Sequence, residues 1–271
     1  MRTSEGLNLA YFASVTILAL LWPLPGPSRI KALVCGVMGL GLTAIGAESD
    51  GRLATDTARA LHDWLPVPAM ALAYWQSGCF FDKANPRLQV LFERSDRALL
   101  RVLHIDAARW ARRRIGGLLE LAYVFCYPVV PLGILALYAS GLRHRVDDYW
   151  TVVLLAAYPC YALLPFVQLL PPRLVSRQDE SPVPDRTLRR FNLWLARRVT
   201  HEANTFPSGH VAASAAIALV LLDLTPHLGL VFLLIALGIA AGCIVGRYHY
   251  AVDVAAAFVL AGAAFAVSGG S

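Results

Sequence analysis

The sequence predicts an all-α, polytopic membrane protein, and three observations lead to this fold class. Of the 271 residues, 57% are hydrophobic and only 15% are charged, whereas soluble domains are about 45–50% apolar and about 25% charged. The mean hydropathy of the chain is +0.55. Eight apolar runs approach the length of about 20 residues that a helix needs to cross a membrane. This composition argues against a cytosolic enzyme and against a nucleic-acid-binding protein.

The eight apolar runs follow one another along the chain, and we expect them to give six to eight crossings. The third and the sixth run are short for a span. The first run is long and has no small-residue cleavage site before Trp22, so we expect an uncleaved helix rather than a secretory signal. The runs lie at residues 7–25, 30–48, 65–81, 117–140, 149–170, 209–224, 228–245 and 250–268.

Two longer polar connections separate these runs. Residues 82–116 carry nine basic and four acidic side chains, and their apolar residues recur at three-to-four spacing. This pattern is typical of an amphipathic helix on a membrane surface. Residues 171–206 hold seven arginines; an irregular stretch at 181–184 precedes a second amphipathic helix predicted over 187–199. The apolar residues of the first helix are Leu88, Leu91, Phe92, Leu99 and Leu103.

The five cysteines all lie inside apolar runs and share no spacing typical of a metal site or of a disulfide framework. We interpret them as packing residues. They are Cys35, Cys79, Cys126, Cys160 and Cys243.

The first cluster of residues that can do chemistry is 204–210, directly before an apolar helix. Pro207 and Ser208 suit a helix start, where unpaired backbone N–H groups favour an anion such as phosphate. Ser208 adds a hydroxyl donor, Gly209 lets a ligand approach the backbone, and His210 can exchange a proton near neutral pH. The alternative interpretation is a capped helix with a histidine at the membrane interface.

The second cluster, residues 246–253, opens the last apolar run. His249 and Asp253 are four residues apart, so on a helix they share one face. The carboxylate can then accept the proton on one ring nitrogen, which makes the other nitrogen a better nucleophile. A buried His–Asp pair that only joins two helices is the alternative.

Together, Pro-Ser-Gly-His at 207–210 and His-Tyr-x2-Asp-Val at 249–254 resemble the type 2 phosphatidic acid phosphatase superfamily. The resemblance extends over about residues 65–268 and implies an all-helical six-span core. We therefore expect two N-terminal transmembrane helices over 1–60 and a phosphatase-like membrane domain over 61–271. The family acts mostly on lipid phosphates through a phosphohistidine, and its chemistry needs no metal or other cofactor.

The resemblance also implies a role for each matching residue. His249 would be the nucleophile that attacks phosphorus, and Asp253 would orient it. His210 would protonate the departing alkoxide. Ser208 and the Gly209 amide would hold the equatorial oxygens of the phosphate.

The first motif of the family, Lys-x6-Arg-Pro, is absent from this chain. The nearest equivalent by order is Leu170-Pro171-Pro172-Arg173, and the residue seven positions before Arg173 is Phe166 instead of lysine. Arg173 is therefore a candidate clamp for the phosphate oxygens without its lysine partner.

The third motif departs from the family pattern as well. The family usually has an arginine six residues before the nucleophilic histidine, where this chain has Cys243. The available arginine is Arg247, only two residues before His249. On a continuous helix Arg247 would point about 200° away from His249, so it can bind phosphate only if residues 246–248 form a loop.

These features leave three functions open. The leading hypothesis is a lipid phosphatase that hydrolyses a phosphate monoester or diphosphate of a lipid, with the bilayer and that lipid as its partners. The departures in the first and third motifs resemble inositol phosphorylceramide synthase-like transferases, which favours phosphoryl-group transfer as the alternative. The third hypothesis is a non-catalytic protein that binds a lipid phosphate.

The last expectation concerns the side of the membrane on which the two motifs lie. In a strictly alternating topology, 19 of the 24 basic residues share the face that carries both motifs, and positive-inside counting would place that face in the cytoplasm. The resemblance points to the extracytoplasmic face of a bacterial-type inner membrane. We favour the second assignment, because arginines near an anionic substrate have their own reason to be there.

Overall fold

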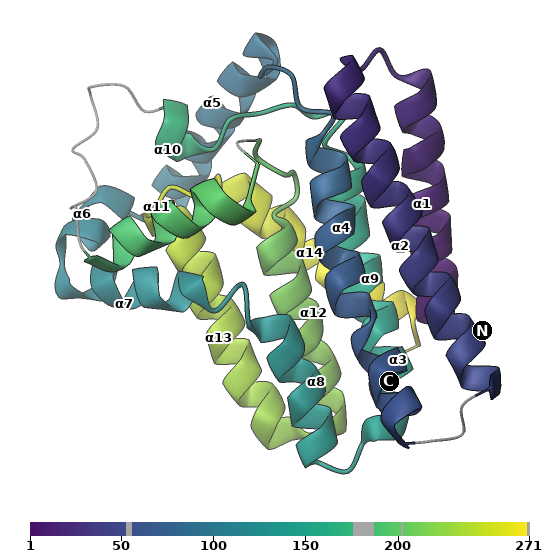
Figure 1. Cartoon of the computed structure of the whole chain (residues 1–271). Helices are drawn as coiled ribbons and strands as arrows, with labels where there is room; N and C mark the ends of the chain where they lie inside the picture. The colour runs from purple at the N-terminus through teal and green to yellow at the C-terminus, as the bar shows by residue number, and fades with distance from the viewer. Residues whose placement is uncertain (53–55, 176–186, 202, 270–271) are drawn as a thin grey trace.

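The computed structural model describes residues 1–52, 56–175, 187–201 and 203–269. All regular secondary structure in these four stretches is helical, apart from one isolated bridge between two loops. The predicted all-α fold class is therefore confirmed. The helices, labelled as in Figure 1, are α1 (Thr3–Leu21), α2 (Gly26–Arg52), α3 (Asp56–Trp64), α4 (Pro66–Gly78), α5 (Pro86–Val102), α6 (Ala107–Arg112), α7 (Arg114–Val124), α8 (Val129–Ala139), the 3-10 helix η1 (Arg143–Arg145), α9 (Val146–Ala162), α10 (Pro172–Val175), α11 (Thr187–Val199), α12 (Gly209–Leu224), α13 (Pro226–Val245) and α14 (Ala251–Val267).

Several of these helices are long and apolar enough to cross a membrane. Within the described residues, α1, α2 over Gly26–Glu48, and α13 meet this criterion individually, and α7 and α8 meet it only as a pair. α12 and α14 are apolar but shorter, and α4 and α9 have 13 and 17 residues. Length and composition thus support three or four membrane-crossing helices, fewer than the six to eight expected, in a polytopic membrane protein.

The apolar run at 117–140, which we expected to cross the membrane, does not form one continuous helix. α7 ends at Val124, α8 begins at Val129, and the two axes differ by 70°. Pro128 lies in the break: it has no N–H to donate, and its ring collides with the carbonyl group four residues earlier in a helix. The bend lets α7 leave the bundle direction and contact α11.

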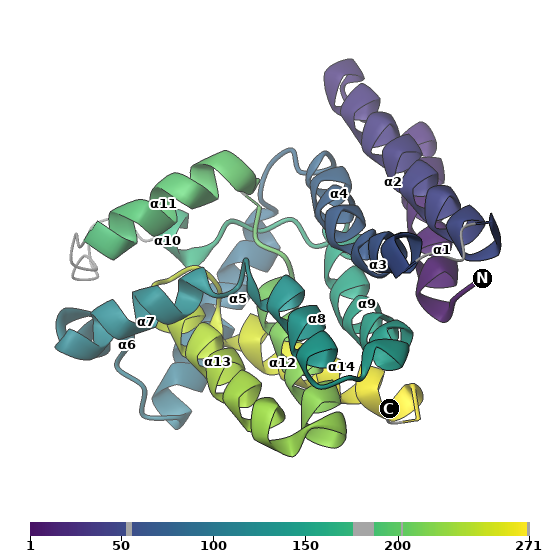
Figure 2. The same cartoon turned by 60° about the horizontal axis from the view of Figure 1, so that its bottom comes forward.

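The centre of the bundle is α12, which contacts α8, α9, α13 and α14. Of its 16 residues, 11 are buried, and most of these are alanine, glycine or serine. Small residues let neighbouring helices approach closely, which is the usual solution for apolar helices in a membrane. α9 joins this group to α1 and α4, with α2 packed outside them (Figures 1 and 2).

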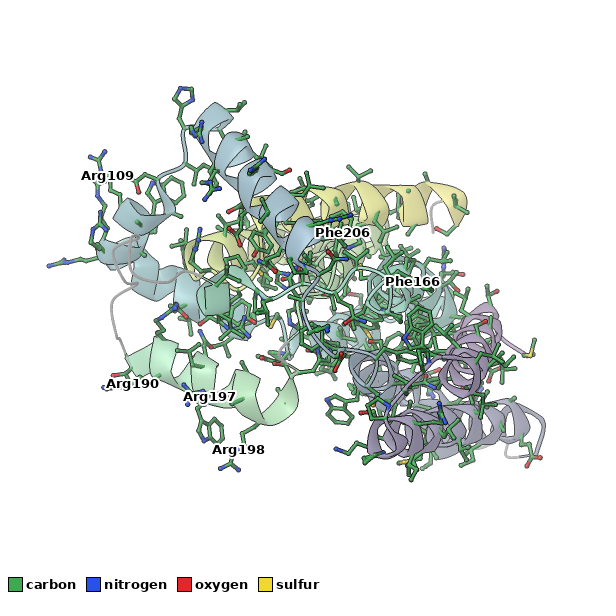
Figure 3. The ribbon with its side chains drawn as sticks, turned by 90° about the horizontal axis from the view of Figure 1, so that it is seen from above. Arg109, Phe166, Arg190, Arg197, Arg198 and Phe206 are labelled. Atoms are coloured by element: carbon green, nitrogen blue, oxygen red, sulfur yellow. The ribbon has the colours of Figure 1, made fainter. Side chains whose placement is uncertain are left out.

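Both predicted amphipathic helices are present at one end of the bundle. α11 has the predicted bounds, and the predicted helix within 82–116 is α5, which is followed by the short α6. Each helix turns one face to the molecule: Phe92 and Asp96 of α5 are buried, as are Asn192 and Ala196 of α11. The predicted irregular stretch at 181–184 lies outside the described residues. Figure 3 shows the labelled arginines of α11 along the outer edge of the molecule.

Candidate active site

α12 and α14 begin, and α13 ends, at one end of the bundle (Figure 1). A polar cavity lies at this end. Its lining comes from α4, α7, α10, the α11–α12 connection with the first turn of α12, and the α13–α14 loop. Three predicted site residues line the cavity: Arg173, His210 and His249. The other lining residues are Tyr74, Tyr123, Pro171, Thr200, His201, Ala203, Asn204, Thr205 and Tyr248.

The two imidazoles face each other across this cavity. The ring centroids of His210 and His249 are 6.0 Å apart, and the ring planes are nearly perpendicular at 82°. Tyr123 and Tyr127 of the α7–α8 region contact the His210 ring edge-to-face at 6.1 and 5.9 Å. His210 is therefore held on one side by aromatic rings and is directed towards His249 on the other.

Asp253 lies behind His249 and is fully buried. Its Oδ2 atom is 3.3 Å from Nδ1 of His249 and accepts hydrogen bonds from Nδ2 of Asn204 at 2.8 Å and the amide of Tyr250 at 3.0 Å. The carboxylate therefore favours a proton on Nδ1 of His249, which leaves Nε2 with its lone pair free.

The His249–Asp253 contact does not come from a shared helix face, as the spacing suggested. α14 begins at Ala251, so His249 precedes the helix. Asp253 is the third residue of α14 and turns back to the amide of Tyr250, in the manner of a capping box. The carboxylate thus caps the helix and holds His249 with the same oxygen atom.

His249 is neutral at physiological pH. Burial lowers its pKa to about 3, and the positive charge of Arg173 adds to this shift. A neutral imidazole keeps a lone pair, which a nucleophile requires. Because the ordinary pKa of histidine is about 6.5, this environment extends the neutral form well into the acidic range.

Arg173 supplies positive charge to the cavity from the short helix α10. Its amide donates a hydrogen bond to the carbonyl of Arg247 at 2.9 Å, which fixes α10 beside the α13–α14 loop. Its guanidinium lies over the ring of Tyr248, 5.5 Å from the centroid. A guanidinium in this position can bind phosphate oxygens in the fork geometry that arginine favours.

Arg247 is not brought to the cavity. The loop that phosphate binding by Arg247 required is present, since α13 ends at Val245 and Arg247 has a φ of 61°. The guanidinium, however, lies 3.7 Å from Asp96 of α5, and Arg247 does not line the cavity. The positive φ turns the chain at this residue, and its side chain is directed towards α5.

Ser208 and Gly209 precede His210 in the chain but do not line the cavity. Ser208 is fully buried, and its amide donates to the carbonyl of Asp253 at 3.2 Å. The Gly209 amide is 3.5 Å from Oγ1 of Thr205. A Cβ at position 209 would be 2.6 Å from the ring of Tyr161, so packing against α9 requires glycine here.

A carboxylate that sequence reasoning missed holds the α13–α14 loop. Glu120 of α7 accepts hydrogen bonds from the hydroxyl of Tyr248 at 2.7 Å and from Asn192 of α11 at 2.6 Å. It also pairs with Arg189 at 2.9 Å. The Tyr248 ring stacks on Tyr123 with centroids 3.8 Å apart. An acidic residue inside a predicted span is costly without a function, and this signal could have identified Glu120.

α5 holds the other side of this loop and was interpreted only as a surface helix. Asp96 accepts a hydrogen bond from the amide of Ala251 at 2.6 Å. Gln89 donates to the hydroxyl of Tyr250 at 2.5 Å and accepts from the amide of Leu170 at 3.0 Å. These polar residues lie on the inner face of the amphipathic helix, where an apolar residue would be expected.

Comparison with known proteins assigns the family. A family model described as the PAP2 superfamily matches residues 97–267, which is well over half of the chain. No curated protein and no solved structure matches the chain significantly. The matched region contains α7 to α14, and with them His210, His249, Asp253 and Arg173. The chain belongs to the PAP2 superfamily, whose members are in general phosphatases and phosphotransferases.

Proposed function

We propose that the protein is a membrane-embedded lipid phosphatase that works through a phosphohistidine at His249. The observation that carries this proposal is the pair of imidazoles, 6.0 Å apart, that face one another in a cavity with Arg173. In this proposal the phosphate group binds in the cavity beside both rings, where His249 contacts phosphorus and His210 contacts the leaving oxygen. The substrate is a phosphate monoester or diphosphate of a lipid.

The first half-reaction forms the phosphoenzyme. Nε2 of His249 donates its electron pair to phosphorus while Nδ1 keeps its proton near Asp253. The bond from phosphorus to the lipid oxygen breaks, and His210 transfers a proton to that oxygen. A general acid in this position typically contributes about 10²–10⁴-fold to the rate.

The second half-reaction returns the enzyme to its starting state. Water attacks phosphorus and gives a proton to His210, while the bond to Nε2 of His249 breaks and its electron pair returns to the ring. Negative charge on the equatorial oxygens is balanced by Arg173, since electrostatic stabilisation dominates phosphoryl transfer. Ser208 and Gly209 support the start of α12 and His210 in this account, and Arg247 binds α5.

Transfer to a lipid hydroxyl instead of water is the second candidate. Phe166, which stands in place of the family lysine, is 56% exposed and packs edge-to-face on Trp22, with ring centroids 5.4 Å apart. It does not line the cavity. The positive charge that the family lysine would carry is therefore missing at this position. The missing charge is the feature shared with the transferase branch, and both reactions use the same first half-reaction.

We place the protein in a bacterial-type inner membrane with the cavity on the extracytoplasmic side. Support for a membrane protein comes from α1, α2 and α13, and support for the side comes from the family resemblance. Labelling of a cysteine introduced at exposed His227, at the opposite end of α12 and α13, would test the side. A membrane-impermeant thiol reagent should leave this cysteine unmodified in intact cells and modify it in lysed cells.

Phosphate release by the purified protein tests the reaction. The substrates are a diacylglycerol phosphate and a polyprenyl diphosphate in mixed micelles, with and without an added diacylglycerol acceptor. We expect free phosphate from the wild type and from the control variant His227→Gln, and a loss of at least about 10³-fold in His249→Gln.

Two results would contradict the proposal. Equal phosphate release by the wild type and His249→Gln would show that His249 is not the nucleophile. Tight binding of the lipid phosphate without turnover would favour a non-catalytic binding protein. Transfer of phosphate from the polyprenyl diphosphate to the added diacylglycerol, giving a new diacylglycerol phosphate in place of free phosphate, would instead support the transferase.

A further inference from the structure

A third histidine lines the cavity beside His210 and His249, and neither motif contains it. His201 follows α11 in the connection to α12. Its ring stacks on Tyr74 of α4 with centroids 4.2 Å apart and planes inclined by 21°. A Cβ added to Gly78 would be 2.2 Å from the ring, so the imidazole lies directly on the backbone of α4. The ring is therefore fixed in place by packing.

Both ring nitrogens of His201 are buried, and neither makes a hydrogen bond of normal length and angle within the part of the chain that the structure describes. Buried polar atoms are nearly always paired, and leaving one without a partner costs free energy. Two other buried histidines each have a carboxylate partner. Asp253 accepts from Nδ1 of His249, and Glu5 pairs with Nε2 of His62. A fixed ring with unused hydrogen-bonding capacity beside a cavity is arranged for a ligand.

The surroundings of His201 define the chemistry of that ligand. Burial lowers the pKa of His201 to about 4, against a smaller opposing effect from a long or poorly aligned hydrogen bond to the backbone of Ala203. The ring is thus neutral, with one N–H donor and one acceptor nitrogen. Arg173 and Thr200 line the same cavity. A donor, an acceptor, a hydroxyl and a guanidinium together suit a phosphoryl group that carries both anionic and protonated oxygens.

We propose that His201 is a substrate-binding residue that hydrogen-bonds the phosphoryl head group held between His210 and His249. This inference rests on the proposed function for the identity of the full substrate. The binding interaction itself applies equally to inorganic phosphate, the product of hydrolysis. His201 takes no proton from the reacting atoms; it contributes to affinity, and its contact is present before and after the chemical step.

Replacement of His201 by residues of matched shape tests this role. His201→Phe keeps a flat ring on Tyr74 and removes both nitrogens, His201→Asn places an amide near the Nδ1 position, and His201→Gln places one near the Nε2 position. His227→Phe is the control, since His227 is exposed at the far end of α13. For each variant we would measure the Kd of inorganic phosphate by calorimetry, kcat and KM with a lipid phosphate, and the Tm.

We expect His201→Phe to raise both the Kd of phosphate and KM by about 2–13-fold, the range of one hydrogen bond. The value of kcat should change less than threefold, and the Tm should not fall. Either the Asn or the Gln variant should restore most of the affinity, which identifies the nitrogen that makes the contact. His227→Phe should match the wild type.

Unchanged Kd and KM in a folded His201→Phe variant would overturn the proposal, and so would a loss of kcat at constant KM. If the Phe variant does not fold, the Asn and Gln variants decide. A wild-type Kd of phosphate and a wild-type KM in both of these variants would contradict the contact. Failure of the proposed function gives a different result, because phosphate binding would then still depend on His201 while no variant or wild type turns over a lipid phosphate.

Discussion

Two clusters of buried polar residues lie at opposite ends of this apolar bundle, and they differ in how completely their groups are paired. In the distal cluster, made by Arg2, Glu5, His62, Asp63 and Arg143, each carboxylate is paired: Asp63 with Arg2 at 2.6 Å and Arg143 at 2.9 Å, and Glu5 with His62 at 2.7 Å. α9 runs between the two ends, from η1 beside this cluster towards the cavity.

The cavity at the other end has the opposite property. Within the described residues, the two buried nitrogens of His201 and the buried Oδ1 atoms of Asn204 and Asp253 make no hydrogen bond of normal length and angle. A cluster whose groups are paired with one another joins helices, whereas one that keeps unpaired groups can bind a ligand. The comparison predicts that substitutions in the cavity reduce activity and that substitutions in the distal cluster reduce stability.

The largest expected effect is that of Asp253→Asn in the cavity. The amide keeps the shape of the carboxylate but no longer favours a proton on Nδ1 of His249. We expect kcat to fall by about 10²–10⁴-fold, with a Tm within a few degrees of the wild type. Near-normal turnover in a folded variant would mean that His249 does not depend on this carboxylate.

Asp63→Asn tests the distal cluster in the same way. The substitution leaves Arg2 and Arg143 without their buried carboxylate, and the hydroxyl of Tyr138 also loses a charged acceptor, now 2.6 Å away. We expect the free energy of unfolding to fall by about 2–3 kcal/mol, measured by thermal unfolding in detergent. The kcat of the remaining folded protein should be unchanged; a selective loss of kcat would erase the distinction between the clusters.

Acidification should destabilise the cavity end through its neutral histidines. Burial lowers the pKa of His249 to about 3 and that of His201 to about 4, whereas the unfolded chain takes up protons near pH 6.5. The unfolded state therefore binds more protons between these values, and stability rises with pH over this window. From pH 8 to pH 5 each histidine should cost about 2 kcal/mol.

The control for this pH effect is the variant that removes the titrating group. Between pH 8 and pH 5, His249→Gln should lose about 2 kcal/mol less stability than the wild type. Parallel pH–stability curves for the two proteins would show that His249 is not kept neutral by burial.

The smallest expected effect is that of Tyr248→Phe, which removes the hydroxyl that donates to Glu120 but keeps the ring on Tyr123. One hydrogen bond to a charged group is lost, so we expect about 1–2 kcal/mol less stability. The α13–α14 loop carries His249, and kcat should fall less than about tenfold. A loss as large as that of Asp253→Asn would place Tyr248 among the reacting groups.

The sequence predicted the helices of the site closely where an apolar run meets a helix-start signal. The run at 209–224 coincides with α12, which Ser208 precedes as N-cap, and α11 has the bounds predicted from its periodicity. The contact between His249 and Asp253 was also predicted, although from a shared helix face, and Arg173, the candidate clamp for phosphate oxygens, lines the same cavity. The helix bounds follow from local patterns, and the site residues follow from the two motifs and the family resemblance.

What the sequence did not predict depends on contacts between distant segments. Nothing near Arg247 in the chain indicates that Asp96, about 150 residues earlier, lies beside it. Asn204 was part of the first motif, but its bond to Asp253 exists only after α12 and α14 pack together. Glu120 and His201 were likewise left without a function, because their partners come from α11 and α4.

The most direct test of the account is a rapid acid-free quench of the enzyme during turnover of a lipid phosphate labelled at phosphorus, followed by mapping of the labelled peptide. The account predicts an acid-labile, base-stable phosphoryl group on His249, absent from His249→Gln and increased when the second half-reaction is slowed. Turnover by the wild type with no label on His249, or label that persists in His249→Gln, would contradict it.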